Sequence, residues 1–258
     1  METTESLDNA TDRIVRSAML IGLIPAVVLG ALLVLVHPLV GLAALIVVAG
    51  VWALAVASRV RGARASLISP LGGTPLASGA QPRLENLLDG LAVTGGVTRP
   101  EVVVRDDTTM NALVAADREG ATLVLTRGLV DGLGRVELEG VLANLLGRQR
   151  DGSARYATVV TALYGAGGRS ARTLLRGLGD QRAVRSDLAA VDMTRYPPGL
   201  IAALGEMTRT GTEVPDATAR SMPLWLAPPA TSTSTVDESL AASTMQPLTL
   251  RIAVLEEL

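Results

Sequence analysis

The chain has 258 residues, of which 48% are hydrophobic, and carries a formal net charge of −2 at pH 7. Its mean hydropathy of +0.38 exceeds that of a typical soluble domain, which indicates that part of the chain lies in a membrane. The acidic balance and the lack of a basic stripe with interleaved aromatics exclude a general attraction to phosphate backbones. We therefore expect no nucleic acid partner.

The residue inventory removes several kinds of chemistry. There is no cysteine, which excludes disulfides, thiolate nucleophiles and cysteine-based metal sites. All 23 basic residues are arginines, so Schiff-base chemistry, Ser/Lys dyads and a Walker-type phosphate loop are excluded. The single histidine is His37, which lies in the predicted membrane segment and leaves no Ser/His triad or His-ligated metal site for the rest of the chain. Arg-only, Ala/Gly/Val-rich usage suggests a GC-rich bacterial genome.

Two apolar runs, residues 18–36 and 39–57, flank a His-Pro turn. A bilayer core of about 30 Å needs about 20 apolar residues in a helix, so each run can span it. We predict a cytoplasmic tail over 1–16 and a transmembrane helical hairpin over 17–58. The alternatives are a cleaved signal peptide, which a second span and the missing cleavage boundary disfavour, and a buried hairpin of a soluble protein.

Arginines lie at the outer ends of both runs and not at the turn, namely Arg13, Arg16, Arg59, Arg61 and Arg64. The positive-inside rule then places the N-terminus and the main domain in the cytoplasm. We expect a multi-pass protein of the inner (plasma) membrane, with the lipid bilayer as a partner. His37 would be an interfacial turn residue or, because histidine titrates near about pH 6.5, a proton sensor.

After the hairpin, residues 59–82 are predicted to be a linker that is rich in Pro, Gly and Ser from residue 65. A helix is expected from 83, a strand at EVVVRDD, two strands in NALVAADREGATLVLT, a short helix at RGLVDGLG and a longer one at VELEGVLANLLGRQRD. Two or three helices follow in 153–208, a loop in 210–238 and a last helix from Pro247. Helices around a small sheet without βαβ alternation predict an α+β fold for 83–258.

One helix carries an unusual polar pair. The segment ELEGVLANLLGRQRD, residues 137–151, is interpreted as amphipathic, with Asn144 and Arg148 four residues apart and on the same face. This spacing is how a helix presents two ligands to one metal ion, yet neither Asn nor Arg is a plausible zinc ligand.

Four stretches in order carry a family resemblance: DDTTMNALVAADREGATLVLTRGLVDGL, VELEGVLANLLGRQRD, RAVRSDLAAVDM and STMQPLTLRIAVLEEL. They resemble the HtpX-like family of membrane-anchored zinc metallopeptidases, relatives of the CAAX prenyl endopeptidases, over residues 83–258 and the preceding hairpin. The resemblance implies a zincin-like (gluzincin-type) domain, mostly helical with a small β-sheet. It also implies metalloendopeptidase activity with zinc as cofactor.

The departures from the family pattern fall on the chemistry. The two histidines and the glutamate of an HExxH helix, which bind zinc and polarise the attacking water, are replaced by Asn144, Arg148 and Leu145. The third ligand falls on Ala183, and the histidine of the C-terminal motif falls on Met245. We therefore predict a degenerate HExxH site with no metal ligand, no catalytic residue and no zinc, although the family uses zinc.

Arg148 should find an acidic partner, because a buried unpaired guanidinium is very costly. Asp187 lies where the family keeps an acidic residue near the metal helix, so an Arg148–Asp187 ion pair is predicted. The alternative is that Arg148 and Arg150 extend to solvent from the C-terminal end of their helix.

The strand hairpin that spans residues 111–126 would align a peptide as an added strand in an active relative, and such main-chain recognition needs no metal. The candidate peptide groove comprises Asn111, Ala112, Thr122, Leu123 and Val124. With Leu145 in place of a glutamate, the position that would activate water is apolar, and we expect a drier pocket. Alternatively, the chain's own loop, within 210–238, fills the groove and nothing binds there.

The sequence thus predicts a membrane-anchored HtpX-like pseudopeptidase that binds no zinc, cleaves no peptide and acts as a binding or regulatory module for a protein or peptide partner. One alternative is an active metalloendopeptidase that uses non-standard metal ligands. Another is an accessory subunit whose hairpin packs against a membrane protein through small residues such as Gly22, Gly30 and Gly41.

Overall fold

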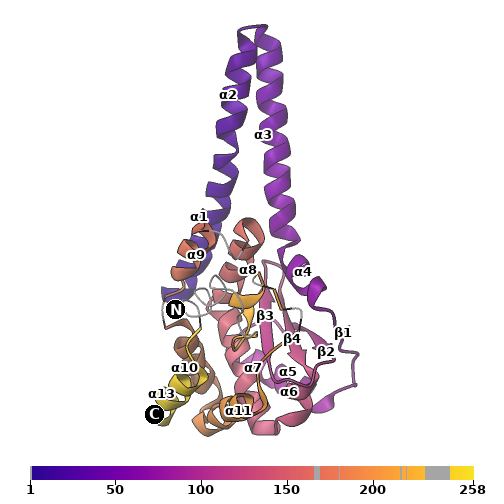
Figure 1. The fold of residues 1–258 in the computed structure, drawn as a ribbon, viewed down its shortest axis with the longest axis vertical. Coiled ribbons are helices and arrows are strands. Elements are labelled where there is room, and N and C mark those ends of the chain that lie inside the picture. Colours follow the sequence, from indigo (N-terminus) through magenta and orange to yellow (C-terminus); the bar gives the residue numbers. More distant parts are fainter. Residues whose placement is uncertain (1, 166–168, 180, 216, 219, 230–244) are drawn as a thin grey trace.

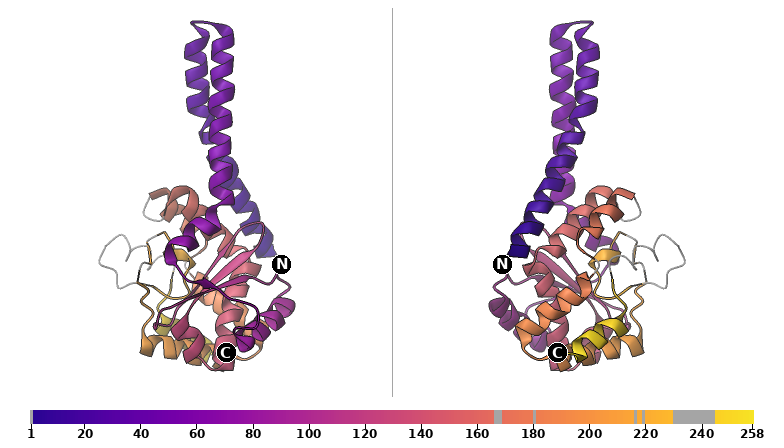
Figure 2. Two further views of the ribbon diagram at one scale, coloured as in Figure 1. Left: turned by 90° about the vertical axis from the view of Figure 1, so that its right-hand side faces the viewer. Right: turned by 90° about the vertical axis from the view of Figure 1, so that its left-hand side faces the viewer.

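A computed structural model describes residues 2–165, 169–179, 181–215, 217–218, 220–229 and 245–258. A long helical hairpin stands on a mostly helical domain that contains a small mixed sheet (Figures 1 and 2). The C-terminus lies at the end of the molecule opposite the hairpin turn, and the N-terminus lies beside the domain (Figure 1). The described residues therefore agree with the predicted α+β class.

The hairpin consists of α1 (Glu2–Ile21), α2 (Leu23–Val34) and α3 (Pro38–Arg61). Residues 7–34 and 38–61 form two helices that are long and apolar enough to cross a membrane, by length and composition. Only 22% and 11% of their most apolar windows are buried, whereas a core helix of a soluble protein would be mostly covered. These exposed apolar side chains suggest contact with membrane lipid.

Glycines let α2 and α3 approach each other closely. A Cβ atom on Gly41 would overlap Val34 and lie 2.6 Å from the carbonyl oxygen of Gly30, and one on Gly22 would overlap the ring of Trp52. The Trp52 indole Nε1 donates to the carbonyl oxygen of Ala18 at 2.9 Å. The three glycines that were predicted to contact another membrane protein therefore pack inside the hairpin itself.

The turn of the hairpin caps its second helix. His37 precedes α3, and its Nδ1 accepts a hydrogen bond from the backbone N–H of Leu39 at 3.3 Å. Pro38 occupies the first helical position, where its missing N–H is not needed. His37 therefore has the expected role of a turn residue.

The predicted tail and linker are structured. α1 extends through residues 2–16, and its Asp8 and Asp12 each lie 2.6 Å from a guanidinium nitrogen of Arg155 on α8 (Ser153–Tyr164). Residues 59–82 include α4 (Ala63–Ile68), the 3-10 helix η1 (Ser69–Leu71) and β1 (Thr74–Pro75). The linker prediction was wrong because Leu67 and Leu71 are buried against the domain.

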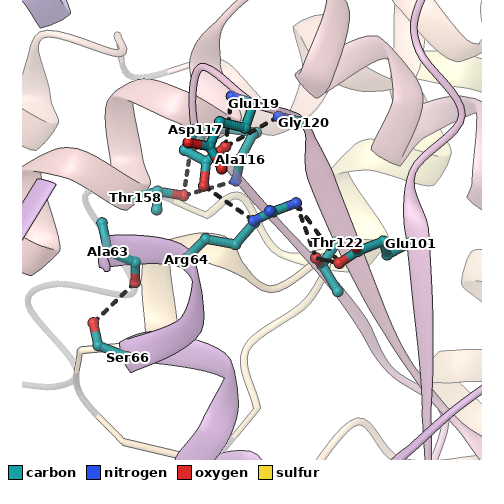
Figure 3. Close-up of polar contacts among 11 residues, drawn as sticks. Ala63, Arg64, Ser66, Glu101, Ala116, Asp117, Glu119, Gly120, Thr122 and Thr158 are labelled. Atoms are coloured by element: carbon teal, nitrogen blue, oxygen red, sulfur yellow. Dashed lines mark hydrogen bonds and ion pairs between the residues drawn. The ribbon is translucent and has the colours of Figure 1, made fainter. Parts of the chain in front are cut away.

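Arg64 ties α4 to the sheet (Figure 3). Its Nε lies 3.0 Å from the Asp117 carboxylate, and its Nη1 donates to Thr122 Oγ1 at 3.5 Å. The same Nη1 is 3.8 Å from Glu101. Because α4 follows α3 almost directly, these contacts fix the base of the hairpin on the domain.

The sheet contains β1, β2 (Glu101–Arg105), β3 (Ala112–Ala116) and β4 (Ala121–Thr126) in the order β1-β2-β4-β3. β2 and β4 are parallel, and β3 and β4 form the antiparallel hairpin that the sequence predicted. β4 is thus a central strand, which the chain order of the three segments does not reveal.

The helices of the domain are α5 (Pro82–Gly95), α6 (Arg127–Gly132), α7 (Arg135–Arg150), α8 (Ser153–Tyr164), α9 (Arg169–Arg176), α10 (Arg182–Thr194), α11 (Pro197–Thr210), the 3-10 helix η2 (Met222–Leu224) and α13 (Leu248–Glu256). The predicted helices at α5, α6, α7 and α13 are confirmed. Residues 153–210 form four described helices, more than predicted, because helical structure is interrupted at Gly165 and Gly179, which have positive φ angles.

α7 lies at the centre of the domain, in contact with α5, α8, α10, α11 and β3 (Figure 1). All of its residues from Leu138 to Arg148 except Glu139 are buried. The amphipathic interpretation was therefore wrong, since neighbouring elements surround the helix. Its polar residues Asn144 and Arg148 need partners inside the protein.

Candidate functional site

A buried polar cluster joins α7, α10, α13 and the segment after η2. Its side chains are Asn144 and Arg148 from α7, Arg182 and Asp187 from α10 and Arg251 from α13, each at most 4% exposed. Three helices that are far apart in the sequence thus place three arginines and one carboxylate together.

Asp187 is the anionic centre of the cluster. Arg251 donates Nε and Nη2 to the two carboxylate oxygens, each at 2.7 Å, and its Nη1 donates to the carbonyl oxygen of Leu226 at 2.7 Å. Asn144 Nδ2 donates to Asp187 Oδ1 at 2.8 Å. This bidentate geometry gives the strongest type of protein ion pair, and both partners are fully desolvated.

Arg148 binds backbone carbonyl groups. Its Nη1 and Nη2 donate to the carbonyl oxygens of Trp225 and Pro223 at 3.2 and 3.1 Å. Burial lowers the pKa of Arg148 well below its ordinary value, and the nearby positive charge of Arg182 lowers it further. Arg148 is only 3% exposed, so the alternative of a solvent-directed side chain was also wrong.

The predicted Arg148–Asp187 ion pair was wrong, because Asp187 pairs with a different arginine. Asp187 pairs with Arg251, whose planar guanidinium matches both carboxylate oxygens. Arg251 comes from a helix 64 residues farther along the chain, which helical spacing on α7 could not indicate.

The segment of residues 221–229, here called the strap, covers the free edge of β3. The backbone N–H of Leu226 donates to the carbonyl oxygen of Ala112 at 2.7 Å, and Trp225 forms an antiparallel bridge with Leu113. Asn111 Nδ2 donates to the carbonyl oxygens of Ala227 at 3.0 Å and Thr212 at 2.8 Å. The strap lies where an added peptide strand would pair.

The predicted peptide groove is therefore closed. Thr122, Leu123 and Val124 belong to β4, which pairs with β2 on one side and β3 on the other and has no free edge. Asn111 and Ala112 border the edge, but their polar groups already bind the strap. In the described part of 210–238, residues 221–229 lie along this edge, which favours the alternative of a groove filled by the chain's own loop over an open groove.

A small cavity of about 10 Å³ lies within the cluster, and its lining includes Asn144, Arg148, Ala183 and Met245. These four positions, which the sequence linked only through the family resemblance, thus meet in one place. Ala183 also donates its backbone N–H to Gln246 Oε1 at 3.0 Å. Leu145 is fully buried in the hydrophobic core.

The chain is similar in sequence to proteins named protease HtpX homolog. It is 28% identical over 208 residues to a protein named protease HtpX homolog from Dictyoglomus turgidum, which covers 66% of this chain and 67% of that protein. It is 29% identical over 185 residues to the homolog from Dictyoglomus thermophilum, covering 57% and 61%. These similarities support an HtpX-like family.

A third protease HtpX homolog, from Tropheryma whipplei, is 35% identical over 114 residues, which cover 43% of this chain and 39% of that protein. The matches thus span from about two fifths to about two thirds of the HtpX homologs' own length. No family model matches the chain.

The residues of this cluster do not fit the zinc ion that the family resemblance implies. The cavity lining contributes guanidinium groups, an amide, a hydroxyl and a thioether, and none of these side chains is an ordinary zinc ligand. In the described part of the chain, no three His, Cys, Asp or Glu side chains lie where they could hold a metal ion. Asp187 is engaged by Arg251 and Asn144.

Sequence reasoning missed Arg182, Trp225 and Arg251 as members of the cluster. Two of them lie in stretches that carried the HtpX-like resemblance, RAVRSDLAAVDM and STMQPLTLRIAVLEEL. An arginine at a motif position was the available signal. Trp225 lies in the segment that was predicted only as loop, and it is 2% exposed.

Proposed function

We propose that this chain is a membrane-anchored HtpX-like pseudopeptidase that binds no zinc, cleaves no peptide and acts as a binding or regulatory module. The observation that supports it most is the side chain of Arg148. It stands at a zinc-ligand position of the family pattern and binds the carbonyl oxygens of Pro223 and Trp225 in the strap. A fixed cation therefore occupies the region where a metallopeptidase would need ligands for a cation.

Electrostatics and packing support the same proposal. Arg148, Arg182 and Arg251 surround the cavity, and a divalent cation beside three guanidinium groups would be strongly repelled. Leu145 replaces the water-polarising glutamate, so no carboxylate stands there as a general base. The strap occupies the edge on which a peptide substrate would align.

The two alternatives have less support. The active metalloendopeptidase rests on the name protease carried by the relatives, and it requires a metal site from other residues. The accessory subunit that acts through the hairpin would need contacts other than Gly22, Gly30 and Gly41, since these glycines pack within the hairpin.

We further propose that the N-terminus and the domain are cytoplasmic and that both hairpin helices cross the inner membrane. Arg13 and Arg16 precede the apolar part of the first span, Arg59 and Arg61 follow that of the second, and no arginine lies at the His37 turn. Because the chain has no cysteine, single cysteines can be introduced at Val36, in the turn, and at exposed Thr94, in the domain. A membrane-impermeant maleimide added to intact spheroplasts should label position 36 only; labelling of position 94 only would reverse the topology.

The decisive experiment measures zinc content and proteolysis in the same preparation. Full-length protein purified in detergent is analysed for metals by mass spectrometry and is incubated with casein, with and without a chelator. An active HtpX-like protease is the positive control. We expect no stoichiometric zinc and no cleavage above buffer, whereas one equivalent of zinc with chelator-sensitive cleavage would overturn the proposal.

A further inference from the structure

Three buried polar atoms of the cluster have no hydrogen-bond partner in the described part of the chain: Arg148 Nε, Arg182 Nη2 and Asn144 Oδ1. The side chains of all three residues line the same small cavity. Arg182 is 4% exposed, and no hydrogen bond of its guanidinium group to a described residue is present. Buried polar groups without partners are rare, so this cluster calls for a ligand.

The charges around the cavity do not balance. Arg148, Arg182 and Arg251 face Asp187, which Arg251 engages with two bonds, and half-buried Asp151, which lies at the end of α7. Burial lowers the pKa of Arg182 to about 10, although Asp151 raises it, so the guanidinium still carries its charge at neutral pH. An uncompensated buried cation is costly, and an anion would relieve it.

The size of the cavity limits the anion. Its volume of about 10 Å³ is close to the smallest space that holds one water molecule. Phosphate, sulfate and carboxylate are too large, whereas a single-atom halide is only slightly larger than water. Guanidinium N–H groups are suitable donors to such an ion.

We propose that Arg148 and Arg182 bind one chloride-sized halide anion in this cavity, at the position that the family resemblance assigns to zinc. The inference rests on the proposed absence of zinc, since the same position would not hold both. Of the three unpartnered atoms, Asn144 Oδ1 is the only acceptor, so an anion would leave it unpaired whereas a water molecule could donate to it. The excess of positive charge favours the anion, because water satisfies the hydrogen bonds and leaves the charge uncompensated.

The test is the thermal stability of the full-length protein in detergent, in sodium chloride and in sodium gluconate at equal ionic strength. Gluconate is too large for the cavity. At a chloride concentration about tenfold above Kd, ligand linkage raises the Tm by about 3–6 °C for a chain of this size. The shift is compared with those of two variants. Arg182→Met removes one of the two donor side chains, and Arg150→Met replaces a half-buried arginine at the end of α7 that does not line the cavity.

We expect the change from gluconate to chloride to raise the Tm of the wild type and of Arg150→Met more than the Tm of Arg182→Met. The response of Arg182→Met measures the general salt effect. Arg182→Met should match or exceed the wild type in gluconate, since it loses an uncompensated charge and no hydrogen bond to a described residue. Equal chloride responses of the wild type and Arg182→Met would show that water fills the cavity and would overturn the proposal. Zinc in the same samples would instead refute the pseudopeptidase function.

Discussion

Replacing Asp187 by asparagine should strongly destabilise the domain. Three donors converge on its two oxygens, namely Arg251 Nε, Arg251 Nη2 and Asn144 Nδ2. An asparagine has one acceptor oxygen, so its NH₂ group would face at least one of these donors. Arg251, 1% exposed, would also lose its counter-ion.

The magnitude follows from the burial of the pair. Removing one partner of a buried ion pair costs about 3–5 kcal/mol, because the other charge stays buried and unpaired. For chains of about this size, 1 kcal/mol changes the Tm by about 2–4 °C. The Tm of Asp187→Asn should therefore fall by about 6–20 °C.

Tryptophan fluorescence can follow this transition locally. The chain has two tryptophans, and Trp225 lies in the strap while Trp52 lies in the hairpin. In a Trp52→Phe background, thermal unfolding in detergent reports Trp225 alone. A double-mutant cycle uses Asp187→Leu, Arg251→Met and the double variant, which should lose less stability than the sum of the losses in the two single variants.

Two results would refute this reasoning. A Tm within about 2 °C of the parent for Asp187→Asn would mean less than about 1 kcal/mol and would show that the pair contributes little. Strict additivity in the double variant would show that the two residues act independently. Either result would also remove the structural basis of the Arg251 contact with the strap.

Three further predictions concern the hairpin, the strap and pH. Gly41→Leu should destabilise the hairpin in detergent, because even its Cβ would overlap Val34, whereas Gly50→Leu on the same helix, with open space around its Cα, should leave the Tm unchanged. Asn111→Ala leaves the buried carbonyl group of Ala227 without this donor, at about 1–3 kcal/mol, and also removes the donor to the partly buried carbonyl group of Thr212. Limited proteolysis within 211–229 should therefore accelerate, while Thr94→Ala at an exposed position should not change it. Burial alone would raise the pKa of Asp12, but hydrogen bonds from Arg118 and Arg155 lower it overall. The stability from Asp12 is thus present above about pH 4 and is lost as the pH falls through the folded pKa. In an acid titration that follows the contact of α1 with the domain, Asp12→Asn should lack this pH-dependent loss of stability.

The local pattern of the sequence predicted most of the regular elements. β3 and β4 were found from two apolar β-branched runs around DREG, and α6, α7 and α13 from their apolar periodicity. β1 was missed because a two-residue strand exists only through its pairing with β2, about 30 residues away in the chain. The error at residues 59–82 has the same origin, since turn-forming residues there are held by contacts with the domain.

The sequence predicted which residues line the site but not the hydrogen bonds that connect them. Matching the motifs brought Asn144, Arg148, Ala183 and Met245 to one cavity. The partners of Arg148 are backbone carbonyl groups of a segment without regular pattern, and side-chain spacing carries no information about them. The polar pair Asn144 and Arg148 on one face also made α7 look amphipathic, although Asp187 and the strap bind these side chains inside the protein.

In the proposed pseudopeptidase, a positive charge would be kept while its ligands are exchanged. In a zinc site, side chains hold a separable cation, and the open coordination position receives water or substrate. Here Arg148 is a cation bonded to α7, and it is the backbone of the strap that supplies the oxygens around it. Because the guanidinium group is covalently attached to the chain, closure of the β3 edge would not depend on metal supply under this proposal. A partner that binds this edge must therefore compete with the strap for Ala112 and Arg148 at the same time.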